Sequence, residues 1–187
     1  LLVHHPFKPL VYVANINSGS VSVIDVEQDK VIKIIPCSNR AEGIDVTPDG
    51  LEIWVTNIKE NFISVINTET YKTTDRIDTA KEPLRLKFSN DGKYCLVSNS
   101  GDGTVSIYDR KTKKQIVNIV IPGKKNIIEK VLYRTPRPEG ILMHPNGLYA
   151  FVSNVTAGRV EVIDMGNFAL VSSIKVGKMP DGLTLIN

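Results

Sequence analysis

The sequence predicts an all-β protein built from four similar units, and three observations support this prediction. A short β-rich run that ends in Asn recurs four times along the chain. Each recurrence is followed at a constant distance by a second run that ends in Asp or Asn, and turn sequences separate the runs at about ten-residue spacing. No stretch has the 3.6-residue apolar period of a long helix.

The Asn residues set the register of the four units. The recurring runs VYVAN, IWVTN, LVSN and FVSN are 42, 42 and 55 residues apart and end at Asn15, Asn57, Asn99 and Asn154. Ten residues further on, the runs SVSVID, FISVIN, TVSIYD and RVEVID end at Asp25, Asn67, Asp109 and Asp164. The spacing inside each unit is therefore constant even where the spacing between units is not, as expected for a structural repeat.

Two further strands complete each unit. Three of the Asn-ending runs are preceded by hairpin turn sequences, which are Pro48-Asp49-Gly50, Asn90-Asp91-Gly92 and Pro145-Asn146-Gly147. A third run follows each Asp or Asn, and a fourth leads to the next turn. Both faces of the strands carry apolar residues, for example Val21 and Val23 on one face and Ile24 on the other. A four-stranded sheet with two apolar faces has to stack on its neighbours, which is the arrangement of β-propeller blades.

The composition excludes several classes of protein. A hydrophobic fraction of 42% is sufficient for a folded core, and no apolar run approaches the roughly 18 residues of a membrane-spanning helix. The net charge of +3 is too small for a dedicated nucleic-acid-binding protein. Two cysteines cannot form a disulfide scaffold. We therefore expect a folded domain with no membrane span and no nucleic-acid partner.

The Asn-ending runs, the V-I-D runs and the Pro-Asp-Gly turn resemble the YVTN family of β-propeller repeats over nearly the whole chain. The resemblance implies a propeller and a surface-layer, periplasmic or extracellular protein. Related propellers occur in haem- or quinone-dependent oxidoreductases and in lactonases, so the resemblance carries over the fold but not one chemistry.

We expect residues 1–187 to form a single propeller segment. Its repeats are about 1–41, 42–83, 84–138 and 139–180, and residues 181–187 would start a further blade. Inner strands are expected at both ends, over Leu1–His5 and Asp181–Ile186. Because the family usually closes a ring of about seven blades, four repeats predict an arc of a larger propeller or a half that pairs with a second copy. Open blade edges in such an arc would favour self-association.

Structural explanations account for most of the chemically distinctive residues. The repeated Asn and Asp side chains are suited to hydrogen bonding with turns at strand ends. His5 and His144 share a register with Thr47 and Ser89, a position that accepts small polar groups, and His4 has no ligand partner at metal-binding spacing. We therefore expect no metal site and no cofactor.

Three other side chains are predicted to be structural as well. Cys95 lies in an apolar register position and is two repeats away from Cys37, so we expect two free thiols. Trp54 is predicted to pack between blades, because its register is shared by Tyr12, Leu96 and Phe151.

The connections that enter the inner strands should converge on one mouth of the propeller channel. Three carboxylates share one register position there, namely Glu42, Glu139 and Asp181. Arg85 occupies a position that is Gly in the other repeats, and Arg40 and Arg137 lie close by. This pattern predicts a mixed-charge rim. It is either a solvated surface of weak ion pairs or a site where guanidinium groups bind an anionic group of a polar ligand.

An insertion lies at the same mouth. The segment from Asp109 to Glu139 spans 30 residues where its equivalents span 17, which leaves 13 extra residues. Its apolar positions fit a short helix, and a lengthened hairpin fits equally. Its candidate partner-binding residues are Lys124, Lys125, Lys130, Tyr133 and Arg134. The insertion is either a loop packed on its own blade or a lid or docking element.

Two functional hypotheses follow. The sequence has no G-x-S-x-G motif, no paired-Cys metal motif and no phosphate-binding Gly loop. The first hypothesis is therefore a non-catalytic binding or scaffold module that recognises a protein or a small polar ligand at the mouth. The alternative is part of a propeller enzyme, lactonase-like or haem- or quinone-dependent, with its active-site residues on blades outside this chain.

Overall fold

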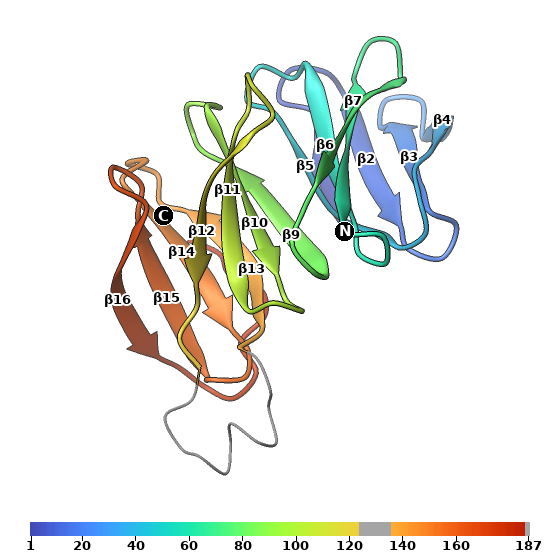
Figure 1. Ribbon diagram of the computed structural model, residues 1–187. Helices are drawn as coiled ribbons and strands as arrows, with labels where there is room; N and C mark the ends of the chain where they lie inside the picture. The colour runs from blue at the N-terminus through green and yellow to red at the C-terminus, as the bar shows by residue number, and fades with distance from the viewer. Residues whose placement is uncertain (124–135, 186–187) are drawn as a thin grey trace.

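A computed structural model of the protein describes residues 1–123 and 136–185 (Figure 1). In these residues the chain forms four antiparallel sheets of four strands each, which confirms the predicted fold class.

Each sheet is one blade, and its strands follow one another in sequence order. The first blade contains β1 (Leu2–His4), β2 (Leu10–Asn15), β3 (Ser20–Asp25) and β4 (Lys30–Pro36). The second contains β5 (Ala41–Val46), β6 (Glu52–Asn57), β7 (Phe62–Asn67) and β8 (Thr73–Asp78). The third contains β9 (Pro83–Phe88), β10 (Tyr94–Asn99), β11 (Thr104–Asp109) and β12 (Gln115–Val120). The fourth contains β13 (Pro138–Met143), β14 (Tyr149–Asn154), β15 (Arg159–Asp164) and β16 (Ala169–Lys175).

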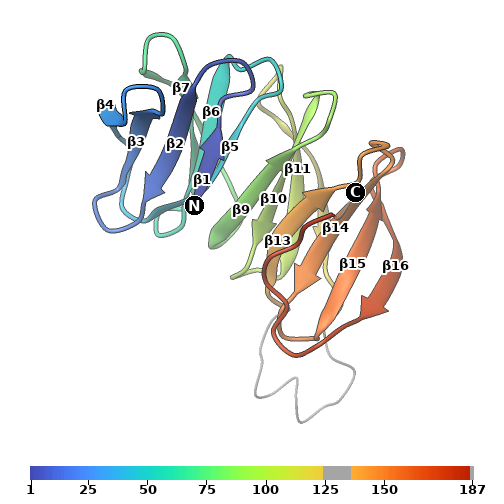
Figure 2. The same cartoon turned by 180° about the vertical axis from the view of Figure 1, so that it is seen from behind.

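The four blades form an open arc rather than a closed ring. Figures 1 and 2 show the first blade at one end of the arc and the fourth at the other, with the first strands β1, β5, β9 and β13 along the inner side. Antiparallel pairing then places the connections between blades at one end of the inner strands. The turns that follow the inner strands lie at the opposite end, which we call the turn face.

The repeated Asn side chains hold the second and third strands of each blade together. Nδ2 of Asn57 donates to Oγ of Ser64 at 3.1 Å, and Nδ2 of Asn99 donates to Oγ of Ser106 at 2.9 Å. In the fourth blade Glu161 replaces this Ser and accepts from Asn154 at 3.0 Å, while its second carboxylate oxygen is buried without a partner. The structural interpretation of the Asn positions is therefore confirmed.

The repeated Asp positions cap turns, as the sequence predicts. Oδ1 of Asp25 accepts hydrogen bonds from two backbone N–H groups at 2.9 Å each, and Oδ1 of Asn67 does the same at 3.0 and 2.8 Å. Nδ1 of His5 serves the same purpose and accepts from the N–H groups of Phe7 and Lys8 at 3.0 Å.

The hydrophobic core lies between the blades rather than within one of them. Three clusters of buried residues each combine side chains of two neighbouring blades. Trp54 of the second blade is completely buried and meets Phe88 of the third edge-on, with 5.2 Å between ring centroids. Cys95 is buried in the same cluster, and both Cys95 and Cys37 are free thiols. The predicted packing of Trp54 and the predicted free cysteines are therefore confirmed.

The two ends of the arc differ from the sequence prediction. An inner strand is present at the first end as β1, but residues 181–185 form no strand, so the inner strand predicted over Asp181–Ile186 is wrong for these residues. Among the described residues no strand pairs with this segment, and a strand needs such a partner for its backbone hydrogen bonds. Ile186 is outside the described residues.

The first blade presents an uncovered apolar face at its end of the arc. Leu2 and Ile34 are 68% and 61% exposed, and they share one row across the sheet with Val13. The corresponding rows of the other blades are covered by a neighbouring blade. Self-association through this face stays a prediction. Within the described residues, no helix has the length and apolar character needed to cross a membrane.

Candidate functional site

The structure brings two of the predicted rim residues into direct contact. Nη1 of Arg85 on β9 donates to Oε1 of Glu42 on β5 at 2.6 Å. Both side chains are largely shielded from solvent, with 20% and 15% exposed. An ion pair at this degree of burial is less screened than one on the open surface, so it holds the second and third blades together at the mouth.

Close backbone packing explains why the register position of Arg85 is Gly in other repeats. A Cβ atom on Gly43 would lie 2.6 Å from the carbonyl oxygen of Leu84, and one on Gly140 would overlap the carbonyl oxygen of Asp181. Strand β9 therefore runs directly against Gly43, and the non-strand segment at Asp181 runs directly against Gly140. Arg85 carries a side chain at this position, and that side chain turns back towards Glu42.

Glu139 and Asp181 form a second charged group at the mouth. Only 13% of the Glu139 side chain is exposed, and Nη2 of Arg137 lies 3.2 Å from its Oε1. Burial raises the pKa of Glu139, and the neighbouring Asp181, to which it hydrogen-bonds, raises it further; Arg137 and Arg85 oppose this shift without cancelling it. The pair can therefore hold a proton at a pH where an ordinary glutamate has lost it.

Arg40 is not part of these groups. Its side chain is exposed, it makes no ion pair with any residue in 1–123 or 136–185, and its φ is 63°. Glu82 and Met179, its equivalents in other repeats, also have positive φ, at 53° each. Sequence analysis did not detect this left-handed turn, because none of the three residues is a glycine.

The candidate partner-binding residues of the insertion are Lys124, Lys125, Lys130, Tyr133 and Arg134, and all five lie outside the described residues. The channel wall carries a further pair that sequence analysis did not single out. Asp45 is buried and accepts from Nζ of Lys87 at 3.1 Å and from the N–H of Phe88 at 3.0 Å. Burial raises the pKa of Asp45, although both partners oppose the shift. A hollow of about 310 Å³ adjoins this pair.

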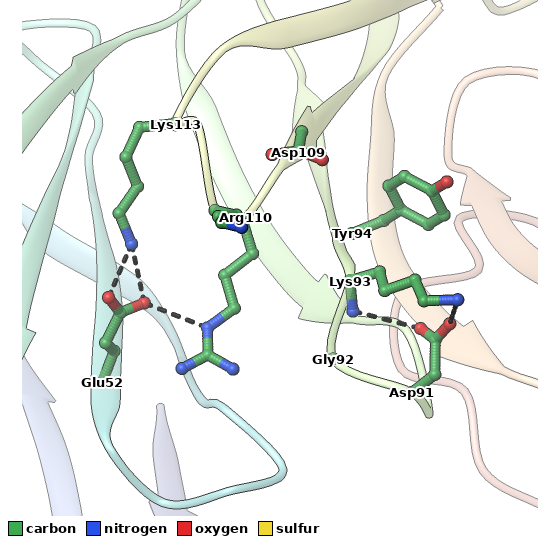
Figure 3. A pocket seen from close by; sticks show the side chains of 9 residues that line it. Glu52, Asp91, Gly92, Lys93, Tyr94, Asp109, Arg110 and Lys113 are labelled. Carbon is green, nitrogen blue, oxygen red and sulfur yellow. Dashed lines mark hydrogen bonds and ion pairs between the residues drawn. The ribbon is translucent and has the colours of Figure 1, made fainter.

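A larger cavity than this hollow lies on the turn face, at the other end of the blades from the mouth, and Figure 3 shows it from close by. This turn-face pocket has a volume of about 590 Å³ and is lined by Glu52, Asp91, Gly92, Lys93, Tyr94, Asp109, Arg110, Lys111 and Lys113. Its residues come from the second and third blades.

One wall of the turn-face pocket is an ionic network between these blades. Glu52 accepts from Nζ of Lys113 at 2.6 and 2.8 Å, from Nε of Arg110 at 3.2 Å and from Nε1 of Trp54 at 3.0 Å. Arg110 also donates through both Nη atoms to Asp49 at 2.6 and 3.1 Å. Burial would raise the pKa of Glu52, but hydrogen bonds from Lys113 and Trp54 lower it overall. Its carboxylate therefore stays ionised.

Sequence analysis missed this network, although a signal was present. Glu52 shares its register with Leu10, Tyr94 and Tyr149, and Arg110 shares its register with Val26, Thr68 and Met165. Charged residues thus replace mostly apolar ones at two positions that face each other across one junction. Comparing charges between register positions would have detected this difference.

Metal-binding side chains are not clustered in the part of the chain that the structure describes. Residues 1–123 and 136–185 contain no group of three His, Cys, Asp or Glu side chains arranged to hold a metal ion. The charged groups at the mouth are instead paired carboxylates and guanidiniums. Such groups bind polar ligands and exchange protons.

Stacked four-stranded antiparallel blades around a channel define the protein as a β-propeller protein. The profile of the family described as Cytochrome D1 heme domain matches residues 8–130, which is more than half of the chain. The chain therefore belongs to this family. These findings support the predicted propeller, but they do not single out the YVTN family.

Comparison with solved structures agrees on the fold. Hydrazine synthase of Kuenenia stuttgartiensis is similar to the chain with a TM-score of 0.78 and 21% sequence identity. The match covers 92% of this chain and 47% of that one, so this chain spans about half the length of the similar protein. At this identity the similarity shows the fold alone. None of the curated proteins compared matches the sequence.

Proposed function

We propose that this chain forms part of the propeller domain of a haem-related periplasmic oxidoreductase and that its mouth contacts a polar ligand of that enzyme. The observation that carries this proposal is the match of the Cytochrome D1 heme domain profile over residues 8–130. The similarity to hydrazine synthase supports it at the level of fold. A periplasmic location is consistent with the same family.

The described residues do not by themselves fit a haem group. Haem iron is held by His, Cys, Met or Tyr side chains. Nδ1 of His5 and Nδ1 of His144 each accept from backbone N–H groups, which places the ring proton on Nε2 and leaves neither nitrogen free for iron. His4 is exposed on the first blade, its Nδ1 lies 3.1 Å from the carbonyl oxygen of His5, and it belongs to no group of metal-binding side chains among the described residues.

Sulfur ligands do not provide a better fit. Cys37 packs against the core between the first two blades, and burial raises the pKa of its thiol to about 11. Met179 lies at the mouth, but 75% of it is exposed and no described side chain completes a site around it. The proposal therefore assigns the iron ligands to parts of the enzyme other than the described residues.

The role left to this chain is to bind and orient a polar ligand at the mouth. Glu42 holds the guanidinium of Arg85 at the channel opening, where its remaining N–H groups can donate to an anionic group. Glu139, with its raised pKa and its neighbour Asp181, can hold a proton beside that ligand.

The test uses the full-length protein that contains this chain. We expect the protein purified from its native source to carry haem, seen as a Soret band with a fixed ratio of haem to protein. Arg85→Gln should leave the haem content unchanged and raise KM for the electron-accepting or electron-donating substrate, because Arg85 is assigned to ligand binding and not to the iron. Arg76→Gln makes the same change of charge on the outer strand β8 and should have no effect on KM.

Two outcomes would overturn the proposal. A full-length protein that contains no haem and does not take it up on reconstitution would favour the non-catalytic binding module. Equal KM values for Arg85→Gln and Arg76→Gln would show that the mouth is a solvated rim.

A further inference from the structure

The turn-face pocket has properties that the fold does not require. At the junction of the third and fourth blades, the positions equivalent to Glu52 and Lys113 are Tyr94 and Phe168, and their rings pack edge-on with 5.0 Å between centroids. An apolar contact is therefore sufficient to hold two blades together at this face. The charged lining at the preceding junction calls for another explanation.

Each carboxylate of the turn-face pocket already accepts hydrogen bonds from within the protein. Glu52 accepts from three different side chains. Asp91 accepts from Oγ of Ser89 at 2.6 Å and from the N–H of Lys93 at 3.1 Å. Asp109 accepts from the N–H and Oγ1 of Thr112 at 2.7 and 2.8 Å.

The ammonium groups are not saturated. Each lysine has three donors. Among the described residues, Nζ of Lys93 has one ion-pair contact, 3.3 Å to Asp91, and 71% of its side chain is exposed. The side chain of Lys111 is exposed and makes no hydrogen bond or ion pair with a residue in 1–123 or 136–185. Hydrogen bonds from Thr112 lower the pKa of Asp109, and the backbone N–H and the charge of Lys111 lower it further. The pocket is lined by four cationic side chains and three carboxylates, and its two exposed lysines keep donors for a ligand, which favours an anion.

Size and shape restrict the anion further. A volume of about 590 Å³ lies within the range of roughly 300 to 1,000 Å³ of small-molecule sites and exceeds what an inorganic ion fills. Tyr94 adds an aromatic ring to the lining that contains the lysines, and Phe168 packs edge-on against that ring. A ligand with an anionic group and an apolar or aromatic body would match both parts.

We propose that the turn-face pocket binds a small organic anion, with its phosphate or carboxylate group on Lys93 and Lys111 and its body against Tyr94. The site is separate from the mouth, since it lies at the other end of the blades. It does not depend on the proposed oxidoreductase function.

Calorimetric titration with phenyl phosphate tests the proposal, with inorganic phosphate and the neutral phenol as comparison probes. The protein with Lys93→Gln and Lys111→Gln should bind phenyl phosphate at least about tenfold more weakly, because two charge-assisted contacts are lost. These two side chains take no part in the network between blades, so the melting temperature should not change. Lys72→Gln with Lys114→Gln removes the same charge from exposed positions outside the pocket and should leave binding unchanged.

The comparison probes separate the two halves of the site. Phenyl phosphate should bind more tightly than inorganic phosphate, phenol should not bind, and added salt should weaken the interaction. Absence of heat with phenyl phosphate at millimolar concentration would overturn the proposal. Equal weakening by the two double substitutions would also overturn it, since the attraction would then come from net charge rather than from the pocket.

Discussion

Replacing Trp54 with Ala should destabilise the fold by about 3–5 kcal/mol, the cost of removing a large buried aromatic side chain. Trp54 is completely buried between the second and third blades. Its ring meets Phe88 edge-on at 5.2 Å, and Nζ of Lys113 lies 4.8 Å from its centroid. The substitution therefore removes packing, an aromatic pair and a cation–π contact at one junction.

Individual contributions place the loss in the upper part of this range. An aromatic pair contributes about 0.5–1.5 kcal/mol beyond its buried area. The hydrogen bond from Nε1 to Glu52 adds about 1 kcal/mol or less, because Glu52 keeps Lys113 and Arg110 as partners. We expect about 4–5 kcal/mol in total.

Urea denaturation followed by circular dichroism measures this loss. Trp54→Phe is the matched control, since Phe151 occupies the same position in the fourth blade; it keeps a ring at the junction and should cost only about 1–2 kcal/mol. A loss below about 1 kcal/mol for Trp54→Ala would refute the reasoning, because a core side chain cannot be removed so cheaply unless the blades are not in contact there.

Three further predictions concern pH and backbone packing. The pKa of Glu139 is raised above 4.5, so the stability that this group contributes is present at low pH and is lost as pH rises through the raised pKa. The melting temperature of Glu139→Gln should therefore decrease less over this rise in pH than that of the parent protein. The pKa of His5 is lowered from 6.5 by burial and then by the charge of Lys8, so stability should fall as pH drops below about 6.5. His5→Asn, which can accept the same two backbone hydrogen bonds, should lose this acid sensitivity in the same melting experiment; an unchanged pH profile would show that His5 is not its source. Gly140→Ala would make Cβ overlap the carbonyl oxygen of Asp181, so it should displace residues 181–185 and increase their amide hydrogen exchange, whereas unchanged exchange would contradict the close packing.

The amino-acid sequence alone determined the blades of this protein. Strand alternation, turn residues and the Asn and Asp positions are local features with a constant spacing, so they predict the four sheets and their order. Burial of Trp54 and Cys95 followed from the same register, because equivalent positions of a repeat have equivalent surroundings. The sequence also placed Glu42, Arg85, Glu139 and Asp181 at one end of the blades.

Tertiary structure decided which of these side chains touch one another. Glu42 and Arg85 are 43 residues apart, and Glu52 and Lys113 are 61 residues apart. Their contacts depend on how closely and at what angle one blade stacks on the next, and strand periodicity carries no information about this packing. The end segment from Asp181 shows the same limit: its sequence repeats an inner strand, but a strand forms only where a neighbouring strand supplies its hydrogen bonds. The repeat therefore specified each blade, whereas the charged mouth and the turn-face pocket arise only from the packing between blades.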